Sequence, residues 1–278
     1  MDPRLIPVPL ADAHEETLFG GKAVSLGAAI RAGLPVPPGA AVSAPLVDAI
    51  AGGDDRALRA LVDSLHLPDG AVAVRSSAVG EDSSDASFAG QHVTRLNVTR
   101  TTLVDAVRDV WESGRASSAL AYRAKRGIDT PPAVAVVVQR LVDPLTAGVL
   151  FTRNPINGAD ECVIEAAWGL GEAVVSSRII PDYYRLAGDG GILEQVPGDK
   201  DVRIARDADG GVTEVPIPVE MRRMPCLQLT HLQQLHALAG RCRQVWGHDL
   251  DLEFAFGADG TLYLLQSRPI TTVRPQSA

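Results

Sequence analysis

Apolar residues at helical spacing mark five segments of the chain. In the first, Leu26 and Ile30 fall on one helical face, and Gly33 follows as a stop signal. Near the C-terminus, Leu232 and Leu235 belong to an apolar stripe of the same kind. The predicted helices cover residues 22–32, 45–65 with a break near 52–53, 101–112, 117–126 and 230–246.

Alternating apolar residues and β-branched runs, closed by turn residues, mark the strands. Valines dominate residues 134–138, and the segments AGVLFTRNP and ECVIEAAWG each end in turn residues. The last predicted element is a hairpin, in which the turn GADG joins LDLEFAF to TLYLLQSRPI. The other predicted strands cover 71–76, 90–98, 182–186, 202–204 and 212–215, with a short one in LPVPPGAAVSA.

These helices and strands mix without a strict βαβ rhythm. The order predicts an α+β protein with two lobes, residues 1–138 and 139–278. Gln139–Val142 is the expected hinge, because it lies midway along the chain and closes a hydrophobic strand.

Composition narrows the possible partners. The 278 residues carry a net charge of −8, which argues against nucleic acid, because phosphate backbones require clustered basic surface. No apolar run reaches the roughly 20 residues that span a bilayer, and no secretory signal precedes the first element. We therefore expect a cytoplasmic protein, and an acidic chain can still bind a small anion through a few cations focused in one place.

Few residues suit metal or disulfide chemistry. Three cysteines lie far apart without a CxxC pair, and no HExxH occurs among the histidines. His231 and His236 stand five residues apart in a helical pattern, which favours solvated histidines over metal ligands. The only lysines are Lys22, Lys125 and Lys200, which makes each of them conspicuous.

A first candidate site lies in FGGKAVSLGAAI. Gly20 and Gly21 precede Lys22 at the expected start of a helix. Glycines let backbone N–H groups approach an anion, and a helix N-terminus carries partial positive charge. The alternative is a turn with an exposed lysine, since no Walker A sequence is present.

A second candidate site is the stretch AVRSSAVGEDSSDASFAGQ. Arg75 ends an alternating strand, and its guanidinium is the group best shaped for bidentate phosphate contact. The following loop is rich in hydroxyl groups and suits a flap over phosphates. An ion pair between Arg75 and Glu81, Asp82 or Asp85 is the structural alternative.

The third candidate site is the final hairpin. Alternation places Glu253 on one strand face, and Leu264, Gln266 and Arg268 share one parity on the next strand. A carboxylate and an amide oxygen on adjacent strands can hold Mg²⁺, which prefers a few protein oxygens together with phosphate and water. The alternative is a solvated sheet face. Taken together, the three sites supply the positioning and charge neutralisation that phosphoryl chemistry on a nucleotide requires.

Long motifs connect these sites to a known family. The stretches GGKAVSLGAAIRAGLPVPPG, AVRSSAVGEDSSDASFAGQ, GVLFTRNP, IEAAWGLGEAVVS and LDLEFAF…LYLLQSRPI run in order from about Leu18 to Thr271. They closely resemble the nucleotide-binding domain of the phosphoenolpyruvate synthase, pyruvate phosphate dikinase and rifampin phosphotransferase family.

The resemblance implies an ATP-grasp fold whose two α+β lobes clamp ATP·Mg²⁺. It implies phosphate contacts for Lys22, Arg75 and Arg268, and a loop over the phosphates lined by Gly90 and Thr94. It also implies adenine contacts for Gln139 and the Leu141 backbone, and Mg²⁺ ligation by Glu253 and Gln266. The family splits ATP to AMP and passes one phosphoryl group to a histidine on a separate swivelling domain, while the other leaves as phosphate or is transferred to phosphate.

The sequence departs from the family in two respects. It contains no region like the phosphohistidine domain or an acceptor domain, so we expect a separate phosphohistidine-domain protein and a small-molecule acceptor; a shortened chain is the other explanation. Ser177 also stands where the family usually has glycine.

Two alternative functions remain open from the sequence. One is a self-sufficient ATP-grasp kinase or ligase acting directly on a small molecule. The other is a nucleotide-binding module without chemistry.

Overall fold

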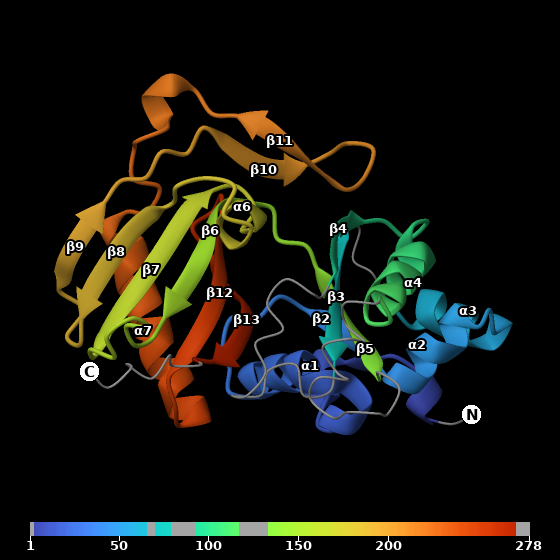
Figure 1. Ribbon diagram of the computed structural model, residues 1–278. Helices are drawn as coiled ribbons and strands as arrows, with labels where there is room; N and C mark the ends of the chain where they lie inside the picture. The colour runs from blue at the N-terminus through green and yellow to red at the C-terminus, as the bar shows by residue number, and fades with distance from the viewer. Residues whose placement is uncertain (1–2, 66–69, 79–92, 117–132, 271–278) are drawn as a thin grey trace. The chain divides into compact units, whose positions relative to one another are not determined.

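The computed structural model describes residues 3–65, 70–78, 93–116 and 133–270. The chain divides into two compact units. Unit 1 comprises residues 1–31, 37–141 and 207–211, and unit 2 comprises residues 32–36, 142–206 and 212–278. Both contain helices and antiparallel sheets, which confirms the α+β class (Figure 1).

Unit 1 is built on a five-stranded sheet in the order β1-β2-β5-β3-β4. Every pairing in it is antiparallel. Its strands are β1 (Val8–Pro9), β2 (Gly39–Val42), β3 (Val72–Ala78), β4 (Thr94–Val98) and β5 (Val134–Arg140). Its helices are α1 (Glu16–Arg31), α2 (Ala44–Ala51), α3 (Asp55–Ser64) and α4 (Leu103–Ser113), with 3₁₀ turns at Pro3–Leu5 and Leu10–Asp12.

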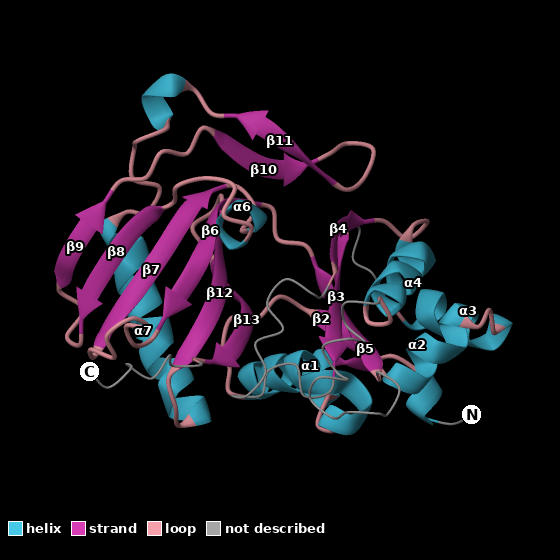
Figure 2. Ribbon diagram, in the orientation of Figure 1, coloured by secondary structure: helices cyan, strands magenta, loops and turns pink. Residues whose placement is uncertain are grey.

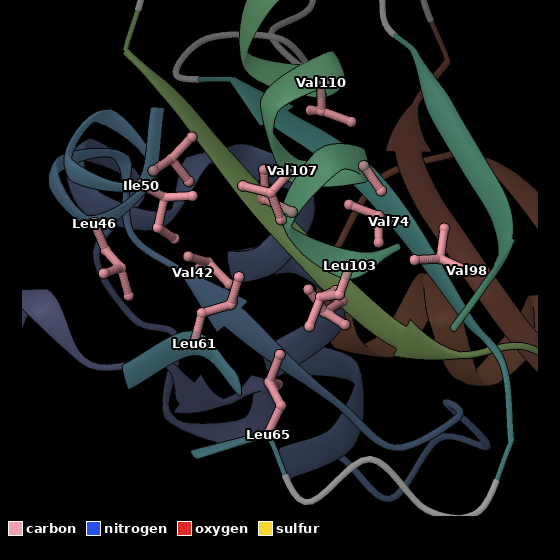
Figure 3. Close-up of a cluster of buried hydrophobic side chains, with 14 of the residues drawn as sticks. Val42, Leu46, Ile50, Leu61, Leu65, Val74, Val98, Leu103, Val107 and Val110 are labelled. Carbon is pink, nitrogen blue, oxygen red and sulfur yellow. The ribbon is translucent and has the colours of Figure 1, made fainter. Parts of the chain in front are cut away.

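One face of this sheet forms the hydrophobic core of unit 1. The even-numbered valines of β3 and β5, such as Val74 and Val136, are buried against α2, α3 and α4. Figure 3 shows Leu46, Leu61 and Val107 from these helices meeting in this cluster. Because side chains alternate along a strand, the odd-numbered residues of β3 and β5 lie on the opposite face.

Unit 2 is built on a six-stranded sheet in the order β13-β12-β6-β7-β8-β9. A separate hairpin pairs β10 with β11. The strands are β6 (Pro144–Phe151), β7 (Glu161–Trp168), β8 (Asp182–Ala187), β9 (Ile192–Val196), β10 (Val202–Arg206), β11 (Val212–Pro216), β12 (Leu250–Gly257) and β13 (Leu262–Pro269). The helices are α6 (Glu172–Val175) and α7 (Leu229–Trp246), with a 3₁₀ turn at Val219–Met221.

Helix α7 covers one face of the six-stranded sheet (Figure 2). On β12, Leu252, Phe254 and Phe256 are buried on this face, and the Phe256 ring lies 4.4 Å from the His231 ring at the start of α7. The other face of the sheet, which we call the open face because α7 does not cover it, carries the odd-numbered residues of β12, of which Asp251 and Ala255 are buried. The apolar stripe predicted for α7 is confirmed, because Leu232, which belongs to it, is buried.

Lys200 has a structural place in unit 2. It is fully buried and pairs with Asp182 on β8. The same carboxylate accepts bonds from the backbone N–H groups of Gly198 (2.8 Å) and Cys226 (2.7 Å). A buried carboxylate with three donors anchors the segments on either side of the β10–β11 hairpin to β8.

Several predicted boundaries are corrected by the structure. Helix α1 starts at Glu16 rather than at Lys22, and β9 and α6 were not predicted at all. The break predicted near residues 52–53 of the helical segment 45–65 is confirmed, because it separates helices α2 and α3. The predicted helix at 117–126 and the start of the strand at 90 lie outside the described residues.

Candidate functional site

A kink in α1 creates a helix start beside β3. Gly20 has φ 73° and ψ 166°, so the residues after it begin a new helical segment inside α1. The backbone N–H of Ala23 donates to the Ser77 hydroxyl at 3.0 Å, which satisfies a donor of the first turn. A side chain at Gly20 would have its Cβ 1.9 Å from the Ser77 carbonyl oxygen. The helix start predicted at the two glycines therefore exists, but within a longer element.

Lys22 is held against β3 by a backbone carbonyl. Its ammonium donates to the Ser76 carbonyl oxygen at 2.7 Å, and the side chain is only 5% exposed. The alternative of an exposed lysine is wrong. The Lys22 ammonium therefore lies beside Ser76, the residue that follows Arg75 on β3, so two of the predicted phosphate ligands come from neighbouring parts of unit 1.

Cross-strand pairing gathers three further predicted residues on the sheet face away from the core. Arg75, 9% exposed, pairs directly with Thr94 on β4. On the other side of β3, Ala73 pairs with Gln139 of β5. Directly paired residues point to the same face, so Arg75, Thr94 and Gln139 share the face that α1 packs on.

The expected adenine contacts are partly engaged within unit 1. The Gln139 amide, 2% exposed, donates to the Pro37 carbonyl oxygen at 3.1 Å. The Leu141 backbone N–H donates to the Ala71 carbonyl oxygen at 3.1 Å. A bond from this N–H to adenine would have to replace that contact. Gly90, the flap after Arg75 and the acids Glu81, Asp82 and Asp85 lie outside the described residues.

In unit 2 the terminal hairpin pairs the two expected metal ligands. Glu253 on β12 lies directly opposite Gln266 on β13, and Asp251 lies opposite Arg268. The register then shifts, so that Phe254 faces Leu264. The expectation that Leu264 lies on the same face as Gln266 is therefore wrong, because the register shift places Leu264 on the apolar face that α7 covers.

Arg268 is fixed by a partner that the sequence reasoning missed. Its Nε and Nη2 atoms lie 2.8 Å and 2.7 Å from Asp251 Oδ2. Burial raises the pKa of Asp251, the Arg268 charge opposes this shift, and Glu253 adds to it. The cross-strand position of Asp251 opposite Arg268 was the signal that could have identified it.

Further acids follow on the neighbouring strands of the open face. Glu253 pairs with Val149 on β6, and Val149 pairs with Glu165 on β7. Glu165 is half-buried, and burial raises the pKa of its carboxyl group. Burial also raises the pKa of Glu172 at the start of α6. Neither acid was predicted as a site residue, because the sequence IEAAWGLGE indicates a strand and a family motif but no role for its acids.

The oxygen donors of the hairpin fit a magnesium ion bound together with phosphate. Glu253 supplies a carboxylate and Gln266 an amide oxygen, and Mg²⁺ uses one or two protein oxygens when phosphates and water supply the rest. Within the described ranges, no group of three or more His, Cys, Asp or Glu side chains is arranged to hold a metal ion. No helix among the described residues is long and apolar enough to cross a membrane.

The departure at Ser177 has a conformational consequence. Ser177 follows α6 and has φ 54°, in the left-handed region that favours glycine. Its N–H donates to the Val174 carbonyl oxygen at 3.1 Å, so it belongs to the turn that ends α6. A glycine at this position would adopt the same turn without steric cost.

Comparisons with known proteins agree with these features. The chain is 35% identical to a probable phosphoenolpyruvate synthase of Methanothermobacter thermautotrophicus, over 92% of this chain and 44% of that protein. It is 38% identical to the prodigiosin synthesizing transferase PigC of Serratia marcescens, over 98% of this chain and 34% of that protein. It is also 38% identical to the phosphoenolpyruvate synthase of Pyrococcus furiosus, over 74% of this chain and 27% of that protein.

The chain thus spans less than half the length of these relatives. Among solved structures, a D-alanine-D-alanine ligase from Coxiella burnetii aligns over 93% of this chain and 49% of that chain, with 12% identity and a TM-score of 0.38, which adds nothing to the assignment. Residues 46–278 match the family described as the AMP/ATP-binding domain of pyruvate phosphate dikinase. The protein belongs to this pyruvate phosphate dikinase AMP/ATP-binding domain family.

Proposed function

We propose that the chain is the ATP·Mg²⁺-dependent component of a dikinase-type phosphotransferase. In this reaction ATP is converted to AMP, one phosphoryl group passes to a histidine on a separate partner protein or domain, and the other passes to water, leaving as phosphate, or is transferred to phosphate. That phosphohistidine then phosphorylates a small-molecule acceptor. The observation that carries the proposal is the direct pairing of Glu253 with Gln266 on the open face, in a chain of an AMP/ATP-binding family.

The residues of unit 1 are proposed to bind the phosphates and the base. Lys22 and Arg75 would neutralise phosphate charge, and Thr94 would add a hydroxyl donor beside Arg75. Gln139 and the Leu141 backbone would contact adenine. Buried cations act more strongly on an anion than exposed ones, because less water screens them.

The residues of unit 2 are proposed to serve the metal and the reacting phosphates. Glu253 and Gln266 would hold Mg²⁺, which when bound neutralises charge on the phosphates. Arg268 would contact a phosphate, and Asp251 keeps its guanidinium beside Glu253 and Gln266 by accepting its Nε–H. These side chains bind and orient the nucleotide, and the attacking atom belongs to the partner's histidine.

The nucleotide product tests this proposal. The chain is incubated with ATP, Mg²⁺ and a candidate histidine-bearing protein, and nucleotides are separated by ion-exchange chromatography. AMP together with acid-labile phosphate on the partner supports the proposal. ADP as the product overturns it in favour of a kinase or ligase that acts directly on a small molecule. ATP binding without turnover, with every partner tested, supports a nucleotide-binding module without chemistry.

A further inference from the structure

We infer that Thr152 and Arg153, through Leu250 and Asp249, position the Glu253–Gln266 pair for Mg²⁺. We call these four residues the β6–β12 knot. The inference rests on the proposed function, since it concerns the same metal pair. None of the four residues was assigned a role in the site from sequence.

The knot begins with a reciprocal pair of hydrogen bonds between two chain segments far apart in sequence. The Thr152 N–H donates to the Leu250 carbonyl oxygen at 2.8 Å. In return, the Leu250 N–H donates to the Thr152 hydroxyl at 2.8 Å. Thr152 and Leu250 are both buried, so water cannot replace these bonds at little cost. They fix the end of β6 against the first residue of β12.

An ion pair continues the knot one residue further out. Arg153 Nε lies 2.6 Å from Asp249 Oδ2, and Arg153 Nη1 donates to the Gly158 carbonyl oxygen at 3.0 Å. Both side chains are about two-thirds covered, with exposures of 35% and 29%. The hydrogen bond from Arg153 to the Asp249 carboxylate, together with the charge of that carboxylate, raises the pKa of Arg153.

The neighbouring residue ties the same point to β7. The Asn154 amide donates to Glu161 Oε1 at 2.6 Å, at the first residue of β7. Its carbonyl oxygen accepts the N–H groups of Ile156 and Asn157, at 2.9 Å and 3.3 Å. The end of β6 is thus bonded to the starts of both strands that flank it in the sheet.

The knot controls which face Glu253 occupies. Below it, Asp251 pairs with Phe151 and Glu253 pairs with Val149. A slip of one residue between β12 and β6 would move Glu253 from the open face to the face buried under α7. Leu250 is three residues before Glu253, so fixing Leu250 to Thr152 fixes this register at the strand's origin.

Arg153 acts at a distance from the metal pair. It lies four residues beyond Val149, the partner of Glu253, which corresponds to about 13 Å along a strand. Arg153 and Asp249 are therefore positioning residues and do not contact the metal. Groups that orient metal ligands typically change metal affinity about 10–100-fold when removed.

The test measures how much Mg²⁺ tightens ATP binding. The dissociation constant for ATP is determined by calorimetry in EDTA and in Mg²⁺. The EDTA value divided by the Mg²⁺ value gives a ratio, which is compared between variants of the full chain. In Arg153→Met and Asp249→Asn we expect the ratio to fall about tenfold, with the EDTA value unchanged within about twofold. Arg153→Lys keeps the charge and should recover part of the ratio.

A matched control neutralises another arginine-paired carboxylate of the same sheet. Glu194 lies 2.7 Å from Arg185 Nε, and Glu194→Gln should leave the ratio unchanged. Hydrogen exchange of the backbone amides of residues 250–253 gives a second readout. These amides should exchange faster in Arg153→Met than in wild type, and at the wild-type rate in Glu194→Gln. Circular dichroism confirms that each variant is folded.

The outcomes separate the inference from the proposed function. Wild-type protein that binds no ATP overturns the proposed function, and the inference with it. Wild-type protein that binds Mg²⁺·ATP, with an unchanged ratio in both Arg153→Met and Asp249→Asn, overturns the inference alone. Equal weakening in EDTA and in Mg²⁺ also overturns it, because that result indicates a general loss of structure.

Discussion

The two sheets of this protein present different polar faces. In unit 1, the sheet face opposite the core carries Arg75, Thr94 and Gln139, and Lys22 bonds to a carbonyl of β3. Lys22 and Arg75 are both at least nine-tenths buried. In unit 2, the open face carries Glu253 and Gln266 beside the Asp251–Arg268 pair. There the arginine side chain is 45% exposed.

The difference lies in how charge is held. In unit 1, the Lys22 ammonium donates to a backbone carbonyl oxygen of β3. Unit 2 places its guanidinium against a carboxylate and keeps further acids in the same and neighbouring strands. The first set suits phosphate oxygens, and the second suits a divalent cation bound with phosphate.

The largest expected effect separates the two faces by their response to Mg²⁺. Glu253→Ala should lower turnover on the order of a thousandfold, the range seen when one electrostatic group leaves a catalytic site, with little change in thermal unfolding. Lys22→Met should weaken ATP binding even in EDTA, because its charge acts without the metal. Steady-state kinetics and calorimetry measure the two effects. Full turnover in Glu253→Ala would show that the metal assignment is wrong.

The next effect concerns the kink that starts the helix beside β3. Gly20→Ala should lower the free energy of unfolding by about 3 kcal/mol, through a left-handed φ and a clash with the Ser77 carbonyl. Gly53 also has a positive φ, of 80°, but its Cβ would meet nothing within 4 Å. Gly53→Ala should therefore lower it by only about 1 kcal/mol. Urea denaturation of both variants measures the difference, and equal losses would contradict the close packing of Gly20 on β3.

A smaller effect contrasts two glutamates of β7. The Asn154 bond and Arg185 lower the pKa of Glu161, whereas burial raises the pKa of Glu165. Glu161 therefore stabilises the folded protein at pH values above the ordinary glutamate pKa of about 4.3. This stabilisation is lost as the pH falls through the lowered pKa that Glu161 has in the folded protein. Glu165 instead lowers stability at neutral pH, and acidification through its raised folded value relieves this penalty.

Two variants measured without Mg²⁺ or nucleotide read this contrast. At neutral pH, Glu161→Gln should be less stable than wild type and Glu165→Gln more stable. The Glu165→Gln difference should shrink as the pH of urea denaturation falls toward about 4.3, whereas the Glu161→Gln difference should shrink only as the pH falls below about 4.3. Differences of the same sign would contradict the claim that Glu161 stabilises the folded protein at neutral pH while Glu165 destabilises it.

The smallest effect concerns the turn after α6 in unit 2. Ser177→Gly should raise the free energy of unfolding by about 0.5–1 kcal/mol, since φ 54° is strained for serine. Ser176 has φ −82° and its hydroxyl donates to the Glu172 carbonyl oxygen at 2.6 Å. Ser176→Gly should therefore be destabilising, and denaturant titration of the two variants compares them. A loss of stability in Ser177→Gly would contradict the strain argument.

Sequence patterns predicted the elements that have a continuous apolar face. Strands β3 and β5 and helix α7 each have a continuous apolar face, and each was found close to its true bounds. Strand β9 was missed because all five of its residues are exposed, which leaves no alternation to detect. Helix α6 was missed because four residues are too short for a helical period.

The candidate site was only partly predictable. Alternation along β12 placed Glu253 on the face opposite Phe254, because neighbouring side chains in a strand point to opposite sides. It could not reveal the register shift beside Glu253, which takes Leu264 off the face of Gln266. It also gave no reason to connect Arg153 with Asp249, which are far apart along the chain.

The sequence by itself determined the α+β class, the family and the residue types available for phosphate and Mg²⁺, because periodicity and motifs are local properties of the chain. Only the tertiary structure decided which of those residues become neighbours. It paired Arg75 with Thr94 and Arg268 with Asp251, and it tied the start of β12 to the end of β6. Such pairings depend on strand register, which local alternation specifies only in part, because hydrogen bonds and packing between distant segments also set it.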